Sequence, residues 1–311
     1  MRLLVVGANG QVGRELRRSL PALGELVVAT RDGAGADAVA DFDVPGSLAG
    51  LVASVAPDVV VNAAAYTAVD QAETQTALAW RLNAELPGEL ARWAAAHGAW
   101  LIHYSTDYVF DGTGSRPWRE DDAPHPVNAY GRSKRAGEEA VLESGARALI
   151  LRVSWLYGLH GANFLKTMLR LGASRRVLRV VADQVGAPTG TGLAAEVSAE
   201  LVRRLRTAPD TCPSGLYHLA PTGETSWYDY AAFVFERARE SGWPLALEAL
   251  EPIASADYPT AAPRPANSRL DTTRLATTFG LRLPPWQDEV ARTVAVLAEP
   301  LSLLPPLMQK S

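Results

Sequence analysis

The stretch VVGANGQVGREL, residues 5–16, decides the fold of the first half of the chain. It places Gly7, Gly10 and Gly13 directly after an apolar run and at the start of a helical pattern. Between a strand and a helix, this Gly-x-x-Gly-x-x-Gly spacing is typical of a dinucleotide-binding turn. We expect Gly7 to allow the tight turn, Gly10 to let the backbone approach a pyrophosphate, and Gly13 to let helix and strand pack closely. The free N–H groups of the helix N-terminus would then face the phosphates.

The segments around this turn predict a parallel sheet. Short runs rich in Val, Leu and Ile alternate with helical patterns, as expected for strands that are covered on both faces. The expected strands are residues 2–7, 25–30, 57–65, 99–106 and 148–158, and the expected helices include 12–20 and 76–96. We therefore expect an α/β fold with a Rossmann-type doubly wound parallel sheet.

The second half of the chain is richer in proline and has fewer clear strands. Helical patterns cover 194–206, 227–241 and 286–298, and YPTAAPRPANS (258–268) has the composition of a loop. These features indicate a smaller mixed domain over the C-terminal edge of the sheet. We expect residues 1–155 to form the dinucleotide-binding domain, with elements near 190–220 returning to it, and residues 156–311 to form mainly the substrate-binding domain.

Composition and charge limit the class of partner. The 311 residues carry a net charge of −4, and the densest basic cluster, VRRLR (202–206), fits the solvated face of a helix, so we expect no nucleic-acid partner. Cys212 is the single cysteine, which excludes an intramolecular disulfide and a multi-cysteine metal site. No apolar run approaches the ~20 residues of a membrane span, and no signal-peptide pattern is visible. We expect a cytoplasmic protein.

The end of the second expected strand bears on the choice of cofactor. An acid at this position would bind the ribose 2′-hydroxyl of NAD. The strand ends instead with the small, neutral Thr30, followed by Arg31, whose guanidinium can pair with a 2′-phosphate. We therefore predict NADPH, with NADH also possible because a shift of one residue would bring Asp32 to the ribose.

The segment NAYGRSK (128–134) carries the chemistry. The chain has only three lysines, and one of them, Lys134, follows Tyr130 by four residues, which is one turn along the same face of a helix. A nearby ammonium can lower the pKa of a tyrosine from about 10 by ~1–3 units and so make it a better acid/base catalyst. Lys134 can also hold the nicotinamide ribose. Ser105 and Thr106 end the strand WLIHYST, where a hydroxyl can complete an oxyanion-binding pair.

These motifs resemble those of a known family. The glycine turn, NAAAYTAVD (62–70), HYSTDYVFDGTG (103–114), NAYGRSK, RVSWLYG (152–158), DQVGAPT (183–189), GLYHLA (215–220) and RPANSRL (264–270) occur in the same order in dTDP-4-dehydrorhamnose reductases, which are extended short-chain dehydrogenase/reductases. Tyr-x-x-x-Lys marks only the superfamily, whereas HYSTDYVF, GLYHLA and DQVGAPT are more specific. The resemblance runs from Arg2 to about Trp286.

The resemblance implies a reaction and a set of residues. It implies hydride transfer from a nicotinamide to C4 of dTDP-4-dehydro-β-L-rhamnose, with Tyr130 as the proton donor and Lys134 as its partner. By position, Thr106 matches the hydroxyl that binds the C4 oxygen, and Asp107 and Trp155 match substrate contacts. The positions that match cofactor contacts are Gly10, Gln11, Val12, Thr30, Asp41, Phe42, Ala65, Tyr66, Thr67 and Tyr104, in addition to Tyr130 and Lys134.

The chain also departs from the family pattern. Some members dimerise around a magnesium ion held by glutamates, and the corresponding positions here are Gly192, Gln287 and Val296. We therefore expect no metal site and no magnesium bridge, although a homodimer remains possible.

Proteins with two other functions have this fold, and both functions are alternative interpretations of the sequence. A sugar-nucleotide 4,6-dehydratase or epimerase is one, but a dehydratase needs Asp-Glu after the threonine, and the order here is Thr106-Asp107-Tyr108. The other is a non-catalytic regulatory subunit like that of methionine adenosyltransferase. The complete set of Tyr130, Lys134 and Thr106 argues against it, because binding alone does not need these residues.

Overall fold

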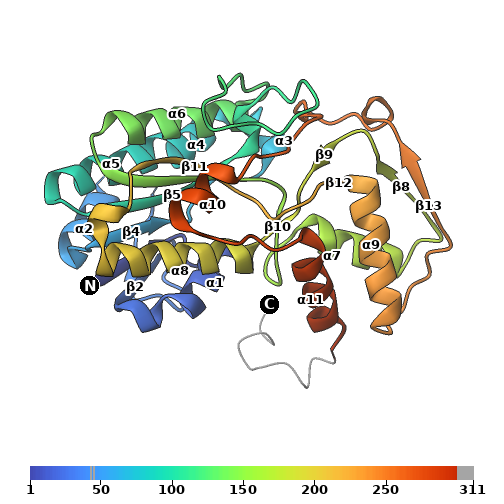
Figure 1. Ribbon diagram of the computed structural model, residues 1–311, viewed down its shortest axis with the longest axis horizontal. Helices are drawn as coiled ribbons and strands as arrows, with labels where there is room; N and C mark the ends of the chain where they lie inside the picture. The colour runs from blue at the N-terminus through green and yellow to red at the C-terminus, as the bar shows by residue number, and fades with distance from the viewer. Residues whose placement is uncertain (43, 45, 300–311) are drawn as a thin grey trace.

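Seven parallel strands form the central sheet of the computed structural model, which describes residues 1–42, 44 and 46–299 (Figure 1). The strand order is β11-β6-β5-β4-β1-β2-β3. The strands are β1 (Arg2–Val6), β2 (Glu25–Thr30), β3 (Ala38–Val39), β4 (Val59–Asn62), β5 (Trp100–Thr106), β6 (Arg147–Val153) and β11 (Gly215–Leu219). The order reverses at β1, which pairs with both β2 and β4. Ligands of such sheets bind beyond the C-terminal ends of the strands at this switch point.

Helices cover both faces of the sheet (Figure 1). Side chains alternate along a strand, so Leu3 and Val5 pack towards one layer while Leu4 and Val6 pack towards the other. The first layer contains α1 (Gln11–Ser19), α8 (Thr191–Thr207) and α10 (Thr273–Phe279), and the second contains α2 (Ser47–Val55), α5 (Leu86–His97) and α6 (Ala129–Glu143). The expected doubly wound α/β fold is confirmed.

A second lobe has its own apolar core beside the sheet. It contains α7 (Phe164–Gly172), α9 (Trp227–Glu240) and α11 (Trp286–Ala298), whose buried aromatic side chains include Tyr230, Phe235 and Trp286. Its short strands form pairs: β7 (Leu156–Tyr157) with β10 (Thr189–Gly190), β9 (Val185–Gly186) with β12 (Thr225–Ser226), and β8 (Val177–Val181) with β13 (Ala249–Ile253). These pairs connect the second lobe without extending the main sheet.

The chain passes between the two lobes several times. It leaves the sheet after β6, returns through α8 and β11, enters the second lobe again at α9, and comes back once more at α10, which packs on β11. The sequence predicted a return near 190–220 and did not predict the one at α10. Short 3₁₀ helices lie at Pro21–Leu23, Asp107–Val109, Pro209–Thr211 and Ser255–Asp257.

The segment before β5 departs from a regular helix. Residues 76–96 were expected to form one regular helix. In the structure, α4 (Thr76–Trp80), a π-helical turn (Arg81–Glu85) and α5 follow one another without a break, and the short α3 (Val69–Ala72) precedes them. At the π-turn, a Cβ on Gly137 of α6 would lie 2.0 Å from the Asn83 carbonyl oxygen. The wider turn therefore lies against α6, the helix that carries Tyr130. No helix among the described residues is long and apolar enough to cross a membrane.

Candidate active site

The glycine turn lies at the switch point of the sheet. Gly7 has φ +80°, and a Cβ on it would lie 2.5 Å from the Ala64 backbone nitrogen, in the loop after β4. A Cβ on Gly13 would lie 2.3 Å from the Gly7 carbonyl oxygen. A side chain at either position would therefore displace the backbone, whereas Gly10 keeps the first turn of α1 open to a ligand.

A cavity of about 350 Å³ lies between the glycine turn and the ends of β2 and β4. The Thr30 side chain is 2% exposed and lines this cavity at the end of β2. Asp32 accepts hydrogen bonds from the Ala34 N–H (3.1 Å) and the Asn9 amide (3.4 Å). The bond from Ala34 is the main cause that lowers the pKa of the Asp32 carboxyl, and the Thr30 hydroxyl and the charge of Arg31 lower it further. The cavity is lined by Gly7, Asn9, Gly10, Thr30, Arg31, Asp32, Phe42, Ala63, Ala64, Ala65 and Leu82. This lining fits the adenosine half of a dinucleotide.

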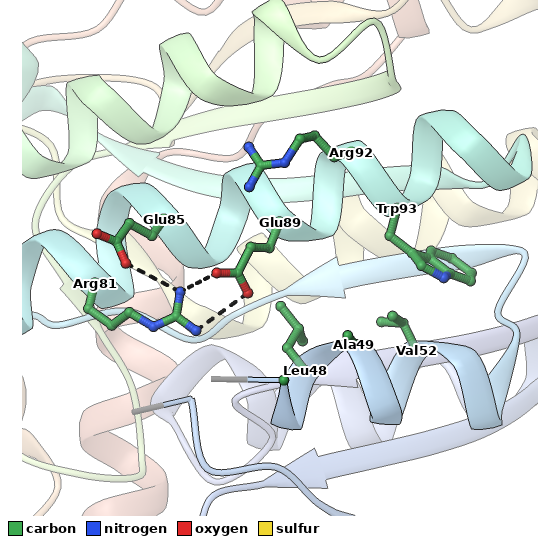
Figure 2. A pocket seen from close by; sticks show the side chains of 9 residues that line it. Leu48, Ala49, Val52, Arg81, Glu85, Glu89, Arg92 and Trp93 are labelled. Carbon is green, nitrogen blue, oxygen red and sulfur yellow. Dashed lines mark hydrogen bonds and ion pairs between the residues drawn. The ribbon is translucent and has the colours of Figure 1, made fainter. Parts of the chain in front are cut away.

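The loop that carries Asp41 and Phe42 is held by Arg81, which lies just before α5. Arg81, in the π-turn, donates from Nε to the Phe42 carbonyl (2.8 Å). Figure 2 shows its guanidinium held between Glu85 and Glu89, at the edge of a groove between α2 and α5. Arg81 therefore positions Phe42 in the cavity, although the sequence analysis did not single it out.

Tyr130 lies beside the end of β5. The Thr106 hydroxyl is close enough to Tyr130 to affect its pKa, and it donates a hydrogen bond to Asp107 (3.2 Å). The N-terminus of α6 is capped by Asn128, which accepts from the Gly131 N–H (2.8 Å). A Cβ on Gly131 would lie 2.1 Å from the Tyr108 carbonyl oxygen, so only glycine lets α6 approach the strand end this closely.

The expected lowering of the Tyr130 pKa by Lys134 is absent from this structure. Burial raises the pKa of Tyr130 to about 12, the Thr106 hydrogen bond opposes this rise, and Asp107 adds to it. Helix spacing alone had not taken the removal of water into account, and a charged phenolate loses hydration when it is buried.

Lys134 is 2% exposed and donates from Nζ to the Tyr104 carbonyl (2.6 Å). Burial lowers the pKa of Lys134 to about 8, while the charge of Glu138 opposes the shift. Only the backbone of Tyr104 therefore faces the site, because its ring points to the opposite layer and its hydroxyl bonds to Ser198 (2.5 Å).

Asn83 connects the loop after β4 to α6, and sequence reasoning missed it. It is fully buried in the π-turn, accepts from the Tyr66 N–H (2.9 Å), and donates to the Tyr66 carbonyl (3.0 Å) and to the Ser133 hydroxyl (3.0 Å). Ser133 in turn donates to the Tyr130 carbonyl (2.8 Å). The loop that contains Ala65, Tyr66 and Thr67 is thus linked to the catalytic helix. A π-turn gives no recognisable spacing signal in the sequence.

The side chains of Gln11 and Val12, two of the expected cofactor contacts, do not point into the cavity beside the glycine turn. Val12 is buried in the core beneath α1. The Gln11 carboxamide accepts from Asn163 (3.0 Å), the residue that caps α7 in the second lobe. Gln11 and Val12 can therefore meet a phosphate through their backbone N–H groups at the start of α1.

Asp107 follows Thr106 directly and is a buried acid beside the candidate site. It is 2% exposed, and burial raises the pKa of its carboxyl to about 7, against hydrogen bonds from Ser268 and Thr106. Its Oδ2 atom is buried without a partner in the described part of the chain. A buried acid with spare hydrogen-bonding capacity fits contact with a polar ligand.

A cavity of about 740 Å³ is lined by Tyr108 on one side and by residues of the second lobe on the other. The Tyr108 ring meets the Tyr130 ring edge-on, with centroids 5.7 Å apart. Apolar and aromatic side chains from α7 and the start of α9 form one wall, and Arg179, Gln184, Ser255 and Arg264 provide polar groups. The cavity extends from the Tyr130 side of the site far enough to hold a molecule much larger than a single sugar. Trp155 lies just beyond the end of β6, with its indole stacked on Trp227.

The glutamate positions that hold magnesium in the resemblance do not form a metal site here. Glu289 of α11 takes the space beside Gly192, where a Cβ would lie 2.6 Å from Glu289 Oε1, and it accepts from the Leu193 N–H (3.2 Å) at the start of α8. No group of three or more His, Cys, Asp or Glu side chains in residues 1–42, 44 and 46–299 could hold a metal ion.

The sheet order, the glycine turn, the buried Lys134 and Thr106 side chains and the partly buried Tyr130 together define a class of protein. This is a dinucleotide-binding oxidoreductase of the short-chain dehydrogenase/reductase type, with an added lobe for a large substrate.

Comparison with known proteins identifies the family. The model of the RmlD substrate binding domain family matches residues 1–299, so the chain belongs to that family. The dTDP-4-dehydrorhamnose reductase of Escherichia coli K12 is 49% identical over 292 residues, which cover 94% of this chain and 96% of the relative. The structure of a dTDP-4-dehydrorhamnose reductase from Bacillus anthracis in complex with NADP matches with a TM-score of 0.82 and 33% identity, over 94% of this chain and 98% of that one. A reductase structure from Clostridium acetobutylicum gives 0.84 and 34%, over 96% and 100%.

Proposed function

We propose that the chain reduces dTDP-4-dehydro-β-L-rhamnose to dTDP-β-L-rhamnose with NADPH. The observation that carries this proposal is Tyr130 beside Thr106 at the end of β5, with its ring against that of Tyr108, which lines the cavity of the second lobe. The near-complete alignment with reductases of the same name supports the choice of substrate.

NADPH is the proposed cofactor, and when bound it supplies the hydride. Thr30 and the exposed Arg31 line the cavity where the adenosine ribose would lie, and the Arg31 guanidinium can pair with a 2′-phosphate. Lys134 would hold the other ribose of the cofactor.

The chain's own residues bind the carbonyl and move a proton. Thr106 would hold the C4 oxygen of the sugar, and Tyr130 would donate its hydroxyl proton to that oxygen as the hydride reaches C4. Because burial keeps the pKa of Tyr130 high, the hydroxyl holds its proton until negative charge develops on the acceptor. Burial of the site also removes water that would compete for the carbonyl oxygen.

The decisive experiment is Tyr130→Phe. We expect kcat to fall by about 10²–10⁴-fold, with the Kd for NADPH unchanged, because the variant removes the acid and keeps the ring. In the wild type, addition of the keto sugar should consume NADPH stoichiometrically, whereas a dehydratase or epimerase would recycle its dinucleotide. A Tyr130→Phe enzyme with nearly full kcat would reject the proposed proton donor.

The cofactor choice is tested by kcat/KM for NADPH against NADH. We expect a preference for NADPH, and we expect Arg31→Ala to lower kcat/KM for NADPH by about tenfold while changing that for NADH little. An Asp121→Ala control changes a charge on the loop before α6, away from the cavity. A clear preference of the wild type for NADH would contradict the assignment of Arg31.

A further inference from the structure

Trp155 has an unusual backbone conformation beside the reaction centre. Val153, at the end of β6, is the register partner of Thr106, so Trp155 follows only two residues after the level of the catalytic threonine. Its φ is +50°, and within the described ranges only Ala56 is another non-glycine residue with positive φ. An aromatic residue rarely adopts this conformation without support from its surroundings.

The support comes mainly from Trp227, the first residue of α9. The two indoles are stacked with ring centroids 3.6 Å apart and planes within 14°. The edge of the Trp155 ring is confined as well, because a Cβ on Gly186 would lie 2.8 Å from it. The Thr189 N–H donates to the Trp155 carbonyl (3.3 Å) and fixes the backbone.

Trp227 is itself held by Gln184. The indole Nε1–H, which can only donate, bonds to Gln184 Oε1 (3.1 Å). At its other end, Gln184 Nε2 donates to the Ser255 hydroxyl (2.9 Å), and that hydroxyl donates to Asp183 (2.6 Å). These contacts determine which end of the carboxamide is oxygen, so the amide cannot flip without losing both bonds.

Gln184 also faces the large cavity. It is 9% exposed and lines that cavity together with Trp227 and Ser255. The hydrogen-bonded chain from Asp183 to Trp227 therefore forms one wall of the proposed nucleotide-sugar site and ends at the Trp155 indole.

We propose that Gln184 and Trp227 are positioning residues for the nucleotide sugar, because they hold the Trp155 indole at the rim of the catalytic site. The inference rests on the proposed function, which supplies the ligand. Loss of either residue weakens binding of the nucleotide sugar and leaves dinucleotide binding intact, since the glycine turn lies in the other lobe.

The test uses Gln184→Met, which keeps the length of the side chain and removes both hydrogen bonds, and Trp227→Phe, which keeps a ring and removes the N–H. Gln287→Met and Trp80→Phe, at exposed positions, are the matched controls. The exciton couplet of the two stacked indoles in circular dichroism directly reports the packing of Trp155 on Trp227. Calorimetry with dTDP-rhamnose and with NADP⁺ reports the two binding sites.

We expect both variants to weaken the couplet, to raise the Kd for dTDP-rhamnose by about tenfold, and to leave the Kd for NADP⁺ and the Tm close to the control values. An unchanged couplet in Gln184→Met would show that Gln184 does not hold the indole pair in place. An unchanged Kd for dTDP-rhamnose would show that the indole pair does not contribute to binding of the nucleotide sugar. An equal loss of affinity for dTDP-rhamnose and for NADP⁺ would show that the two residues have only a structural role. A wild-type protein that does not bind dTDP-rhamnose would instead reject the proposed substrate.

Discussion

The two lobes of this molecule are built by different means. In the dinucleotide-binding half, continuous apolar strands and a glycine turn place the backbone, and the ligand would meet mainly main-chain groups. In the second lobe, the strands are short and separate, and stacked or hydrogen-bonded side chains from distant segments shape the cavity. The first construction depends on periodicity and backbone sterics, whereas the second depends on specific side-chain pairs.

The two lobes also contain ion pairs that differ in their exposure to water. Arg152 of β6 and Glu138 of α6 form a two-bonded pair (2.7 Å each) and are 1% and 0% exposed. Arg176 and Glu248, which connect the segments before β8 and β13, form a similar pair (2.8 and 2.7 Å) with 76% and 58% of their side chains exposed. The geometry is alike, and the access to water differs.

The largest effect on stability is expected for Glu138→Gln. The variant leaves the buried Arg152 guanidinium without its anion, and we expect a loss of about 3–5 kcal/mol in the free energy of unfolding. Urea unfolding measures it. The double variant Glu138→Leu, Arg152→Met removes both charges and should recover most of the loss. A single variant within 1 kcal/mol of the wild type would contradict the account of this pair.

Asp107→Asn should give an intermediate effect of opposite sign. The folded-state pKa of Asp107 is raised to about 7 from an ordinary 3.8, so between these values the folded protein holds a proton that the unfolded chain releases. Stability is therefore lost as the pH rises from about 4 to about 7. Asn removes this loss, and we expect the variant to be more stable than the wild type at pH 8 by about 1–3 kcal/mol, with weaker substrate binding.

The control for Asp107 is Asp121→Asn, at a 73% exposed carboxylate. Thermal unfolding at pH 5 and pH 8 compares the two variants. If Asp107→Asn has the same pH dependence as the wild type, the carboxyl is charged throughout, and the argument from burial is wrong.

The smallest effect is expected for Glu248→Gln. Water screens this exposed pair, so we expect the free energy of unfolding to change by less than about 1 kcal/mol. Urea unfolding next to Glu138→Gln gives the direct comparison. A loss as large as that of the buried pair would show that water access does not govern the difference between them.

Most of the main sheet could be predicted from the sequence. The run at 25–30 matches β2, and the helix at 286–298 matches α11. The strand expected at 148–158 was too long, because it includes the left-handed Trp155 and the separate strand β7. Apolar runs mark what is buried, and they do not mark where the backbone bends.

The candidate site was predictable to a different degree. The spacing of Tyr130 and Lys134 and the strand end at Thr106 were enough to place three groups together, because helix and strand periods fix their directions. The hydrogen bonds from Asn83 to Ser133 and from Gln184 to Ser255 join segments that are far apart in the chain. Such pairs leave no local pattern in a single sequence.

The sequence by itself determined the parallel sheet and the glycine turn and led to the choice of Tyr130, Lys134 and Thr106 as candidate reacting side chains, since each follows from local spacing and apolar periodicity. Only the tertiary structure decided the charge state of those side chains. Burial raises the pKa of Tyr130, lowers that of Lys134 and raises that of Asp107, because packing removes the water that would stabilise each charged form.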